Sequence, residues 1–376
     1  MIIIYFLRLF SYIMSSKQQY RLLTFYHFVD IPDARSEVQS HYNFVHDIWL
    51  KGRIYIGEEG ISATVTWLPG QIVAYRLYLQ AHPYFHDIVD IDIKSNRVDK
   101  HCFEKMIVKY RSEIVSLGKV CNADEIKTHK QVITTQDFQD ILNRREQDQL
   151  DQQYVILDMR NNYEYLLWHF KGAIPAGTIN FKELSDHLQT YKDQFAGKKV
   201  ISYCTGWIRC EKATVLMRQA GIDQVYQLDG WVVKYINTHD DGNWLGNLYT
   251  FDGRVSTPVG TKQTHTTIGR CIYSDELTDH CENCRYSPCN ARIICKPNQY
   301  RLHMWFCSQE CADQAKQSLM IKNTKRDKLD YQSMRDLAKK ESDKIPSLLK
   351  IVHDHIQEKL ANKSFQQIHS HKEVVG

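Results

Sequence analysis

The chain of 376 residues is 43% hydrophobic, 24% charged and 11% aromatic, a composition that excludes wholesale disorder and suits two or three folded domains. Its 48 Lys and Arg residues nearly balance its 44 Asp and Glu residues, so net charge alone does not indicate nucleic-acid binding. The 11 cysteines are clustered, which indicates metal binding and a reactive thiol in a reducing, cytoplasmic compartment and excludes a secreted disulfide scaffold.

The first segment, residues 1–20, begins with the apolar run MIIIYFLRLFSYIM. The run has 14 residues and contains Arg8, so it is shorter than the roughly 20 apolar residues of a membrane-spanning helix. No small-residue cleavage site of a secretory signal follows it. We therefore predict an apolar leader with no membrane partner, and we expect translation to start at either Met1 or Met14.

Residues 21–125 alternate between strand and helix signals. Pro32 precedes a helical stretch, and Gly57 and Gly60 mark a tight turn between two strands. The order strand, helix, strand, strand, helix, strand predicts a ferredoxin-like or acylphosphatase-like α+β domain, a fold that hosts many functions. The predicted strands are RLLTFYHFV (21–29), the two in RIYIGEEGISATVTW (53–67), IVDIDI (88–93) and MIVKYRSEIV (106–115), and the predicted helices are 33–50 and 70–80.

Residues 126–240 combine short apolar strands with amphipathic helices, which predicts a parallel α/β sheet. Gly221 ends the longest of these helices. The predicted strands are YVILDMR (154–160), KVISY (199–203) and VYQLDGW (225–231), and the predicted helices are 135–143, 161–168, 210–221 and 232–237.

A connector rich in glycine and aromatic residues, 241–270, leads to a Cys-rich segment, 271–311, that holds seven of the 11 cysteines. CxxC and FCSxxC pairs can supply four thiolates in a tetrahedron, so we predict a structural zinc site with structural disulfides as the alternative. The first-choice ligands are Cys281, Cys284, Cys307 and Cys311. Cys289 and Cys295, with Cys271 and His303, complete a second site or stay free.

The last segment, residues 312–376, carries the excess positive charge of the chain. From Lys316 to Gly376 there are 13 Lys and Arg against 8 Asp and Glu. Apolar residues at helical spacing from Ile345 to Leu360 predict a helical tail.

The loop KKVISYCTGWIRCEKATVLMRQAG is the strongest functional signal. Cys204 ends a strand, and a helix is expected from Glu211, so residues 205–209 form the turn between them. Loop N–H groups, the positive end of the helix and Arg209 all stabilise a thiolate. We therefore predict a reactive Cys204 that titrates below the roughly 8.5 of a free cysteine; the alternative is a buried, inert cysteine.

This loop, with DMRNNYEY and FKGAI before it and VYQLDGW after it, resembles a rhodanese domain. The six-residue count from Cys204 to Arg209 matches the loop of sulfurtransferases. With FYHFVDIPD, GEEGISAT and the trailing cysteines, residues 22–311 resemble the bacterial tRNA uridine hydroxylases that contain a rhodanese domain. The resemblance implies an oxygen-dependent enzyme, an oxidoreductase, that places 5-hydroxyuridine at the wobble position of tRNA.

The resemblance also implies the roles of the loop residues. Cys204 matches the catalytic cysteine that passes through a persulfide, and the substrate-binding residues are Thr205, Gly206, Trp207, Ile208 and Arg209. The family has glycines where this chain has Trp207 and Trp231. Trp207 either offers a stacking face for a base or makes an interdomain contact.

Two further groups near the loop have structural and functional interpretations. Arg160 is expected to pair with Asp158 or Glu164 and support the loop. Cys210 is either a packed residue of the first helical turn or a thiol that resolves an oxidised Cys204.

Clusters of Lys and Arg are candidates for phosphate contacts with tRNA, although each is equally a solvated face of an ordinary element. The candidates are Lys105, Lys109 and Arg111 on one face of a strand, the run KNTKRDK (322–328), Lys339 and Lys340.

The leading hypothesis is therefore a tRNA-modifying enzyme that hydroxylates C5 of the wobble uridine with molecular oxygen as co-substrate. No nucleotide-cofactor motif is present in the sequence. One alternative is a sulfurtransferase that carries sulfane sulfur on Cys204 from thiosulfate or a sulfur donor protein. The other is a non-catalytic adaptor that binds zinc and RNA.

Overall fold

The computed structural model describes residues 20–90, 94–98, 101–147, 153–206, 208–240, 242–249, 256–257 and 266–318. These residues form two compact units. The first unit contains the described residues up to Met159 and from Asn180 to His239. The second contains Arg160–Ile179, Asp240–Tyr249 and the described residues beyond Val255. The predicted leader (except Tyr20), Trp207 and most of the predicted tail lie outside the described residues.

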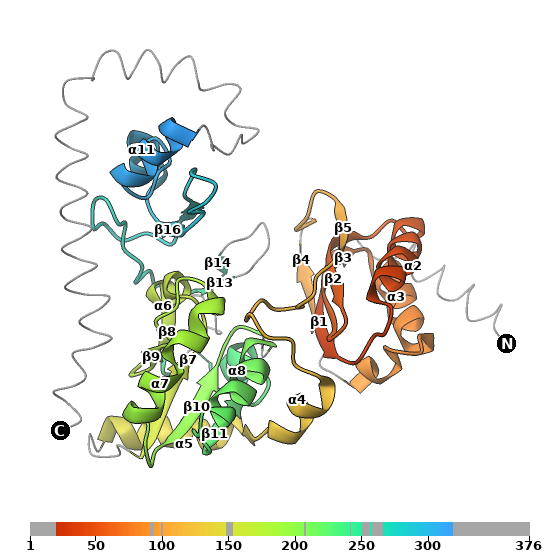
Figure 1. Ribbon diagram of the computed structural model, residues 1–376, viewed down its shortest axis with the longest axis horizontal. Coiled ribbons are helices and arrows are strands. Elements are labelled where there is room, and N and C mark those ends of the chain that lie inside the picture. The colour runs from red at the N-terminus through yellow and green to blue at the C-terminus, as the bar shows by residue number, and fades with distance from the viewer. Residues whose placement is uncertain are drawn as a thin grey trace. The chain divides into compact units, whose positions relative to one another are not determined.

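A five-stranded sheet forms the first half of the first unit (Figure 1). Its strand order is β4-β1-β3-β2-β5, and all neighbours are antiparallel except β2 and β5. The first four strands have the order of a ferredoxin-like fold, which confirms the predicted fold class. The strands are β1 (Tyr20–Phe28), β2 (Lys51–Gly57), β3 (Gly60–Trp67), β4 (Lys94–Val98) and β5 (Met106–Tyr110).

Two helices, α2 (Ala34–Asp47) and α3 (Pro69–Ala81), cover one face of this sheet. Asp33 caps α2 by accepting a hydrogen bond from the N–H of Ser36 at 3.0 Å. In β2 and β3 alternate side chains are buried against the helices, Ile54 and Ile56 in β2 and Ile61, Ala63 and Val65 in β3, so the apolar alternation seen in the sequence marks the face that meets them. On the opposite face, Tyr26 and Phe28 pack against Ile126 and Val215, which lie in helices of the second half of this unit.

Gly60 is required by the close approach of two strands. Its φ is +141°, and a Cβ atom there would lie 2.0 Å from the backbone oxygen of His27. This confirms the predicted turn between Gly57 and Gly60, which are paired at the end of β2 and β3.

The strand predicted at 88–93 is wrong for its first residues, because a 3-10 helix, η1 (His86–Asp90), occupies them. Phe85 and Ile88 are both buried in the core. A spacing of three residues brings them to the same side in a 3-10 turn, whereas it would place them on opposite faces of a strand. The next strand begins at Lys94.

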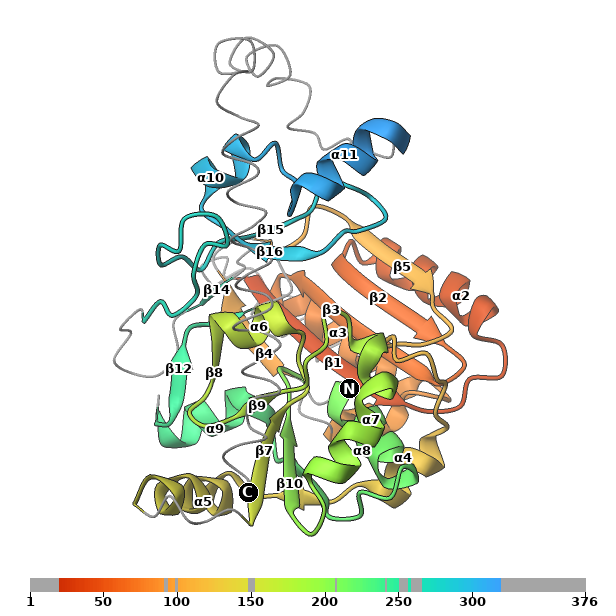
Figure 2. The ribbon, with the colours of Figure 1, turned by 60° about the vertical axis from the view of Figure 1, so that its left-hand side comes forward.

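The second half of the first unit contains parallel strands in the order β6-β11-β10-β7, and Figure 2 shows β7 beside β10. Helix α7 packs on α8, and α5 packs on α9. This confirms the predicted parallel α/β sheet. The strands are β6 (Val132–Ile133), β7 (Tyr154–Asp158), β10 (Lys199–Tyr203) and β11 (Val225–Leu228). The helices are α4 (Ala123–His129), α5 (Thr135–Gln147), η2 (Phe181–Glu183), α7 (Leu184–Gln194), α8 (Ile208–Gln219) and α9 (Trp231–His239).

The second unit is built from short elements. Three antiparallel pairs, β8 with β12, β13 with β14 and β15 with β16, replace a large sheet. The elements are α6 (Asn162–Leu167), β8 (Trp168–Phe170), β9 (Ile174–Pro175), β12 (Trp244–Gly246), β13 (Leu248–Tyr249), β14 (Ser256–Thr257), β15 (Cys281–Asn283), β16 (Arg292–Ile294), α10 (Pro297–Leu302) and α11 (Gln309–Ser318).

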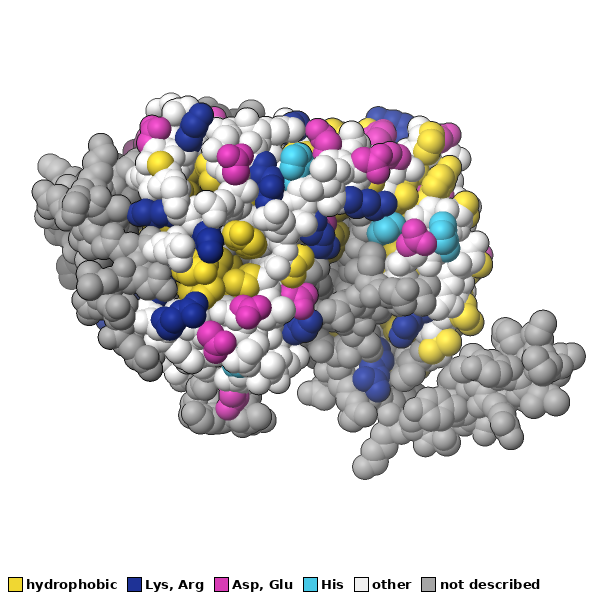
Figure 3. Space-filling view, turned by 90° about the horizontal axis from the view of Figure 1, so that it is seen from below, with side chains coloured by type: hydrophobic (Ala, Val, Ile, Leu, Met, Phe, Trp, Pro, Cys, Tyr) yellow, Lys and Arg dark blue, Asp and Glu magenta, His cyan; other side chains and the backbone are white. Residues whose placement is uncertain are grey.

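The surface reflects the near balance of charge in the composition. On the face in Figure 3, Lys and Arg side chains are interspersed with Asp and Glu. Within the described parts of the chain, no helix has the length and hydrophobicity needed to span a membrane.

Candidate functional site

Cys204 follows β10 directly and is fully buried. Helix α8 begins at Ile208, before the start that the sequence predicts at residues 210–211, so Arg209 and Cys210 lie in its first turn. The short connection is closed by a hydrogen bond of 2.7 Å from the N–H of Ile208 to the carbonyl of Gly206. The structure therefore brings Cys204, Arg209 and Cys210 together at the amino end of a helix.

The surroundings of Cys204 favour its thiolate. Burial alone would raise the pKa of Cys204, but a hydrogen bond from the Cys210 thiol, the charge of Arg209 and the N–H groups of Gly206 and Cys210 outweigh it. Together they lower the pKa of Cys204 to about 6. Burial and the bond to Cys204 raise the pKa of Cys210 well above its ordinary value. Cys204 is thus the charged partner and Cys210 the hydrogen-bond donor.

The loop also presents a polar group to a ligand. The hydroxyl oxygen of Thr205 is buried and has no hydrogen-bond partner among the described residues. A buried hydroxyl without a partner is costly, so a bound molecule that supplies one is favoured. Trp207, predicted beside it, lies outside the described residues.

Tyr26 connects the first domain to this loop. Burial raises the pKa of Tyr26 well above its ordinary value, and the charges of Glu211, Cys204 and Cys210 and a hydrogen bond with Glu211 raise it further. The phenol therefore stays protonated beside the thiolate. Tyr26 belongs to an apolar cluster that also holds Phe28, Ile114, Cys121, Ile126 and Val215.

A buried ion network is centred on Lys212, two residues beyond Cys210. The Nζ atom of Lys212 lies 3.0 Å from Oε2 of Glu59 and 2.7 Å from Oε2 of Glu113, and it also donates to the carbonyl of Val115 at 3.2 Å. Burial raises the pKa of Glu59 despite Lys212, whereas for Glu113 burial is outweighed by Lys212 and two backbone N–H groups, which lower its pKa. This network joins α8 to the turn that contains Glu59.

Sequence reasoning did not identify Tyr26, Glu59, Glu113 or Lys212. The only local signal was the pair of acids in GEEG, because two carboxylates beside a tight turn are unusual within a buried sheet. Lys212, the partner of Glu59, is 153 residues away in the chain.

Asp158 and Arg160, predicted to support the loop, are both buried. Asp158 accepts a hydrogen bond of 2.7 Å from the hydroxyl of Tyr203. Arg160 donates to the carbonyl of Trp168 and lies 5.4 Å from the ring centre of Trp244. The ion pair of Arg160 with Asp158 or Glu164 stays a prediction.

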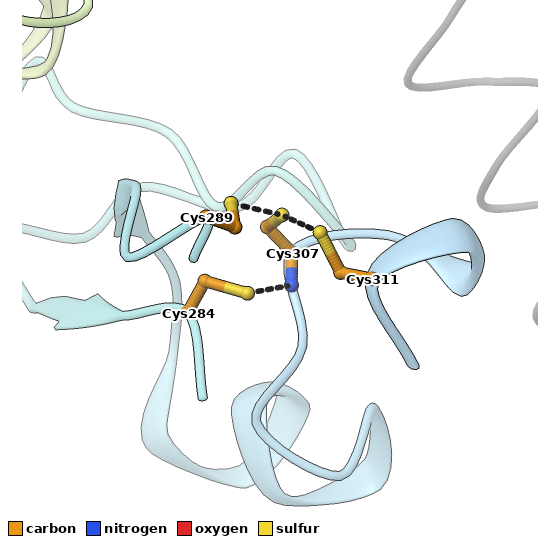
Figure 4. A group of neighbouring side chains, drawn as sticks. All are labelled: Cys284, Cys289, Cys307 and Cys311. Carbon is orange, nitrogen blue, oxygen red and sulfur yellow. Dashed lines mark hydrogen bonds between the residues drawn. The ribbon is translucent and has the colours of Figure 1, made fainter. Parts of the chain in front are cut away.

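Four cysteines of the second unit converge on one point (Figure 4). The Sγ atoms of Cys284, Cys289, Cys307 and Cys311 all lie within 4.8 Å of one another. Cys307 is 3.6 Å from Cys289 and 3.5 Å from Cys311, sulfur to sulfur. Zinc–sulfur bonds of about 2.3 Å in a tetrahedron require sulfur atoms about 3.8 Å apart. The group therefore fits a zinc ion.

Hydrogen bonds within the group place the charge on one sulfur. Hydrogen bonds with Cys284 and Cys307 lower the pKa of Cys289. The bond with Cys289 raises the pKa of Cys284, and the bonds with Cys284 and Cys289 raise the pKa of Cys307. The backbone N–H of Cys307 donates to Sγ of Cys284 at 3.5 Å. Thiolates are the form that binds metal, so metal binding would release the protons that Cys284 and Cys307 hold.

Cys281, a first-choice ligand from the sequence, is not in this group, and Cys289 takes its place. Cys281 pairs with Ile294 in the ladder of β15 and β16, and the ladder continues as Cys284 N–H bonds to Ala291. Residues three apart in an extended chain point to opposite faces, so Cys281 cannot join Cys284. Cys281 is buried instead, in electrostatic contact with Cys295. Cys271 and Cys295 lie together in a separate cluster with Tyr300.

Three family models match the chain. The acylphosphatase-like domain of the UPF0176 family matches residues 20–114, the rhodanese-like domain matches residues 136–238, and the rhodanese C-terminal model matches residues 245–312. The domain boundaries drawn from the sequence, at 125, 240, 270 and 311, stay predictions.

Curated relatives match most of the chain. A tRNA uridine(34) hydroxylase of Bacillus velezensis is 35% identical over 297 residues, which are 78% of this chain and 89% of the relative. That of Oceanobacillus iheyensis is 35% identical over 300 residues, 79% of this chain and 90% of the relative. Among solved structures, a rhodanese-like domain from Anabaena is 20% identical, covers 31% of this chain and 80% of that chain, and has a TM-score of 0.25.

Proposed function

The chain belongs to the family of the tRNA uridine(34) hydroxylases, and we propose that it converts the wobble uridine of tRNA to 5-hydroxyuridine with molecular oxygen. The observation that carries this proposal is the buried Cys204 with a pKa of about 6 on the rhodanese loop. The names of the relatives favour hydroxylation over sulfur transfer. The charged Cys204 argues against an adaptor without catalytic function.

The thiolate of Cys204 suits addition to C6 of a pyrimidine ring, because this addition makes C5 nucleophilic. Transfer of one oxygen atom of O2 to C5, loss of the C5 proton and release of the Cys204 thiolate would then restore the ring, with the second oxygen atom reduced to water by an external two-electron reductant. Before addition, Cys210 holds the sulfur in its charged form by donating a hydrogen bond. The buried hydroxyl of Thr205 is placed to bond a polar group of the base. Gly206, Ile208 and Arg209 complete the proposed substrate loop, together with Trp207. A persulfide on Cys204 that reacts with oxygen is the alternative route.

We further propose that Cys284, Cys289, Cys307 and Cys311 bind a structural zinc ion. Their thiolates would join β15 to α11 and the loop between α10 and α11. A short segment with little apolar core gains its stability from such a metal.

The proposed function is tested in a bacterial host that lacks its own tRNA uridine(34) hydroxylase. Nucleosides of its tRNA are measured by mass spectrometry after complementation with the wild-type chain, with Cys204→Ala and with Cys102→Ala as the matched control. We expect 5-hydroxyuridine with the wild type and with Cys102→Ala, and none with Cys204→Ala.

Full rescue by Cys204→Ala would contradict the proposal. A tRNA pool without 5-hydroxyuridine in every strain, combined with thiosulfate:cyanide activity that depends on Cys204, would favour the sulfurtransferase instead.

A further inference from the structure

The sheet of the first domain has a second face, on which Tyr26 and Phe28 pack against Ile126 and Val215 while the middle of the face is open. Helices α2 and α3 both pack on its other face, through residues such as Ile54 and Val65. Strand alternation therefore directs a second set of side chains away from them. The open face comprises the members of this set that are not buried: Thr24 of β1, Lys51, Arg53 and Tyr55 of β2, Ser62 and Thr64 of β3, and Ile107 and Lys109 of β5. Leu22, Tyr26, Phe28 and Thr66 belong to the same set but are buried.

The open face combines cations with aromatic rings. The guanidinium of Arg111, directly after β5, lies 5.5 Å from the ring centre of Tyr55. The guanidinium of Arg53 lies 5.6 Å from the ring centre of Phe103. Arg53, Lys109 and Arg111 are exposed to solvent. Cations that alternate with flat rings are what a single-stranded nucleic acid requires, because phosphates meet the charges and bases stack on the rings.

No Asp or Glu occupies a position of the open face in β1, β2, β3 or β5, the strands whose side chains the structure describes. The nearby acids Glu59 and Glu113 are both paired with Lys212. The sign of the charge on this face is therefore uniformly positive, which favours a polyanion as its occupant.

A row of paired residues links the open face to the reactive cysteine, and its inner end, Tyr26, is buried. Tyr26 pairs with Ser62, Ser62 pairs with Tyr55, and Tyr55 pairs with Lys109. These four residues form one row across the sheet, about 14 Å long at about 4.8 Å per strand. At one end of the row, Tyr26 is in electrostatic contact with Cys204. At the other end, Lys109 is exposed.

We propose that this open face binds single-stranded RNA of the anticodon loop, with a base stacked on Tyr55 and phosphates held by Arg53, Lys109 and Arg111. The row from Lys109 to Tyr26 then directs the neighbouring nucleotide toward Cys204. This inference rests on the proposed function for the identity of the RNA. The sequence predicts phosphate contacts for Lys109 and Arg111. This inference adds a ring on which a base stacks, the direction of the RNA along the row, and the contact of the row with Cys204.

The test is a binding titration of the full chain with a fluorescent RNA hairpin of about 17 nucleotides that carries a uridine in its loop. Tyr55→Ala is expected to weaken binding about 5- to 150-fold, the effect of removing one stacked base. Tyr55→Phe keeps the ring and is expected to bind like the wild type. Arg53→Glu and Arg111→Glu are expected to weaken binding and to reduce the salt slope by about 0.7 for each phosphate that the variant no longer neutralises.

Arg35→Glu is the matched control. Arg35 is exposed on α2, and its guanidinium lies 4.1 Å from the ring centre of Tyr110, on the helix-covered side of β5. A guanidinium beside a tyrosine ring is thus also present on the helix-covered face of the sheet. Binding by Arg35→Glu within about twofold of the wild type supports the proposal. An equal loss of affinity with Arg35→Glu, or none with Tyr55→Ala, overturns it.

Four further outcomes of these experiments test the proposal. Equal affinity for a fully paired RNA of the same length overturns the claim that the face binds single-stranded RNA. The absence of RNA binding by the wild type overturns the proposal in favour of a protein partner. Unchanged binding by the face variants, with hydroxylation still dependent on Cys204, overturns this inference alone. Binding that depends on the face, without any hydroxylation, overturns the proposed function alone.

Discussion

The low pKa of Cys204 makes a quantitative prediction about Cys210. The hydrogen bond from the Cys210 thiol is the largest of the contacts that stabilise the Cys204 thiolate. A hydrogen bond to a charged group contributes about 1.5–3 kcal/mol, and one pKa unit corresponds to about 1.4 kcal/mol. Cys210→Ala should therefore raise the pKa of Cys204 from about 6 by roughly one to two units.

The assay is the rate of alkylation of Cys204 by iodoacetamide between about pH 4 and pH 10, read by mass spectrometry of its peptide. At pH 7 a thiol with a pKa of about 6 is roughly 90% thiolate, against about 1% for a pKa near 9. A thiolate of lower pKa is also a weaker nucleophile, by about 20-fold over three units. The net gain in rate is only about fourfold, so the midpoint of the profile is the decisive quantity and not the rate.

Three results together decide this prediction. The wild-type midpoint is expected near pH 6, the Cys210→Ala midpoint roughly one to two units higher, and the Cys102→Ala midpoint unchanged. A wild-type midpoint at or above about 8.5, the value of a free cysteine, would refute the assignment of Cys204 as an activated thiolate. A midpoint that Cys210→Ala leaves in place would refute the role of Cys210.

Four other predictions follow from the described contacts. Between about pH 6 and about pH 9, the unfolded chain binds more protons at Cys204 than the folded chain. The free energy of unfolding, measured by urea denaturation, should therefore rise with pH across this window. A fall would contradict the lowered pKa. Lys212→Met leaves Glu59 buried without its cation and should cost about 3–5 kcal/mol of stability in urea denaturation, whereas a loss under about 1 kcal/mol would show that the network is not buried in solution. Cys289→Ser should reduce the zinc content measured after purification while Cys281→Ser leaves it unchanged, and the reverse would reinstate the sequence-based ligand set. Gly60→Ala should lower the melting temperature markedly, because the new Cβ would lie 2.0 Å from a backbone oxygen of β1; an unchanged melting temperature would show that β1 and β3 can separate at this point.

Local patterns were sufficient to predict most of the fold. The apolar alternation of β1 to β3 and the pair Gly57 and Gly60 predict the hairpin, because a tight turn and a buried face each need particular residues at particular spacings. The same holds for β7, β10 and β11, which are short apolar runs between helices. The position of Cys204 between a strand and a helix also follows from neighbouring residues alone.

The segment 85–90 shows where local pattern fails. Val89, Ile91 and Ile93 alternate with polar residues as in a strand, yet Phe85 and Ile88 are both buried in the same core. Only packing against that core selects the 3-10 turn, since both conformations are compatible with so short a run.

The sequence by itself determined the two domain types, the strand–loop–helix arrangement around Cys204 and the cysteine-rich segment, because each depends on residues close together in the chain. The tertiary structure decided which distant side chains contact the helix after Cys204 and which cysteines lie together. Tyr26 and Glu59 reach α8 only through long-range packing, and the register of β15 with β16 places Cys289 rather than Cys281 beside Cys284. Contacts across many residues depend on how whole elements pack and pair, and no local spacing encodes that arrangement.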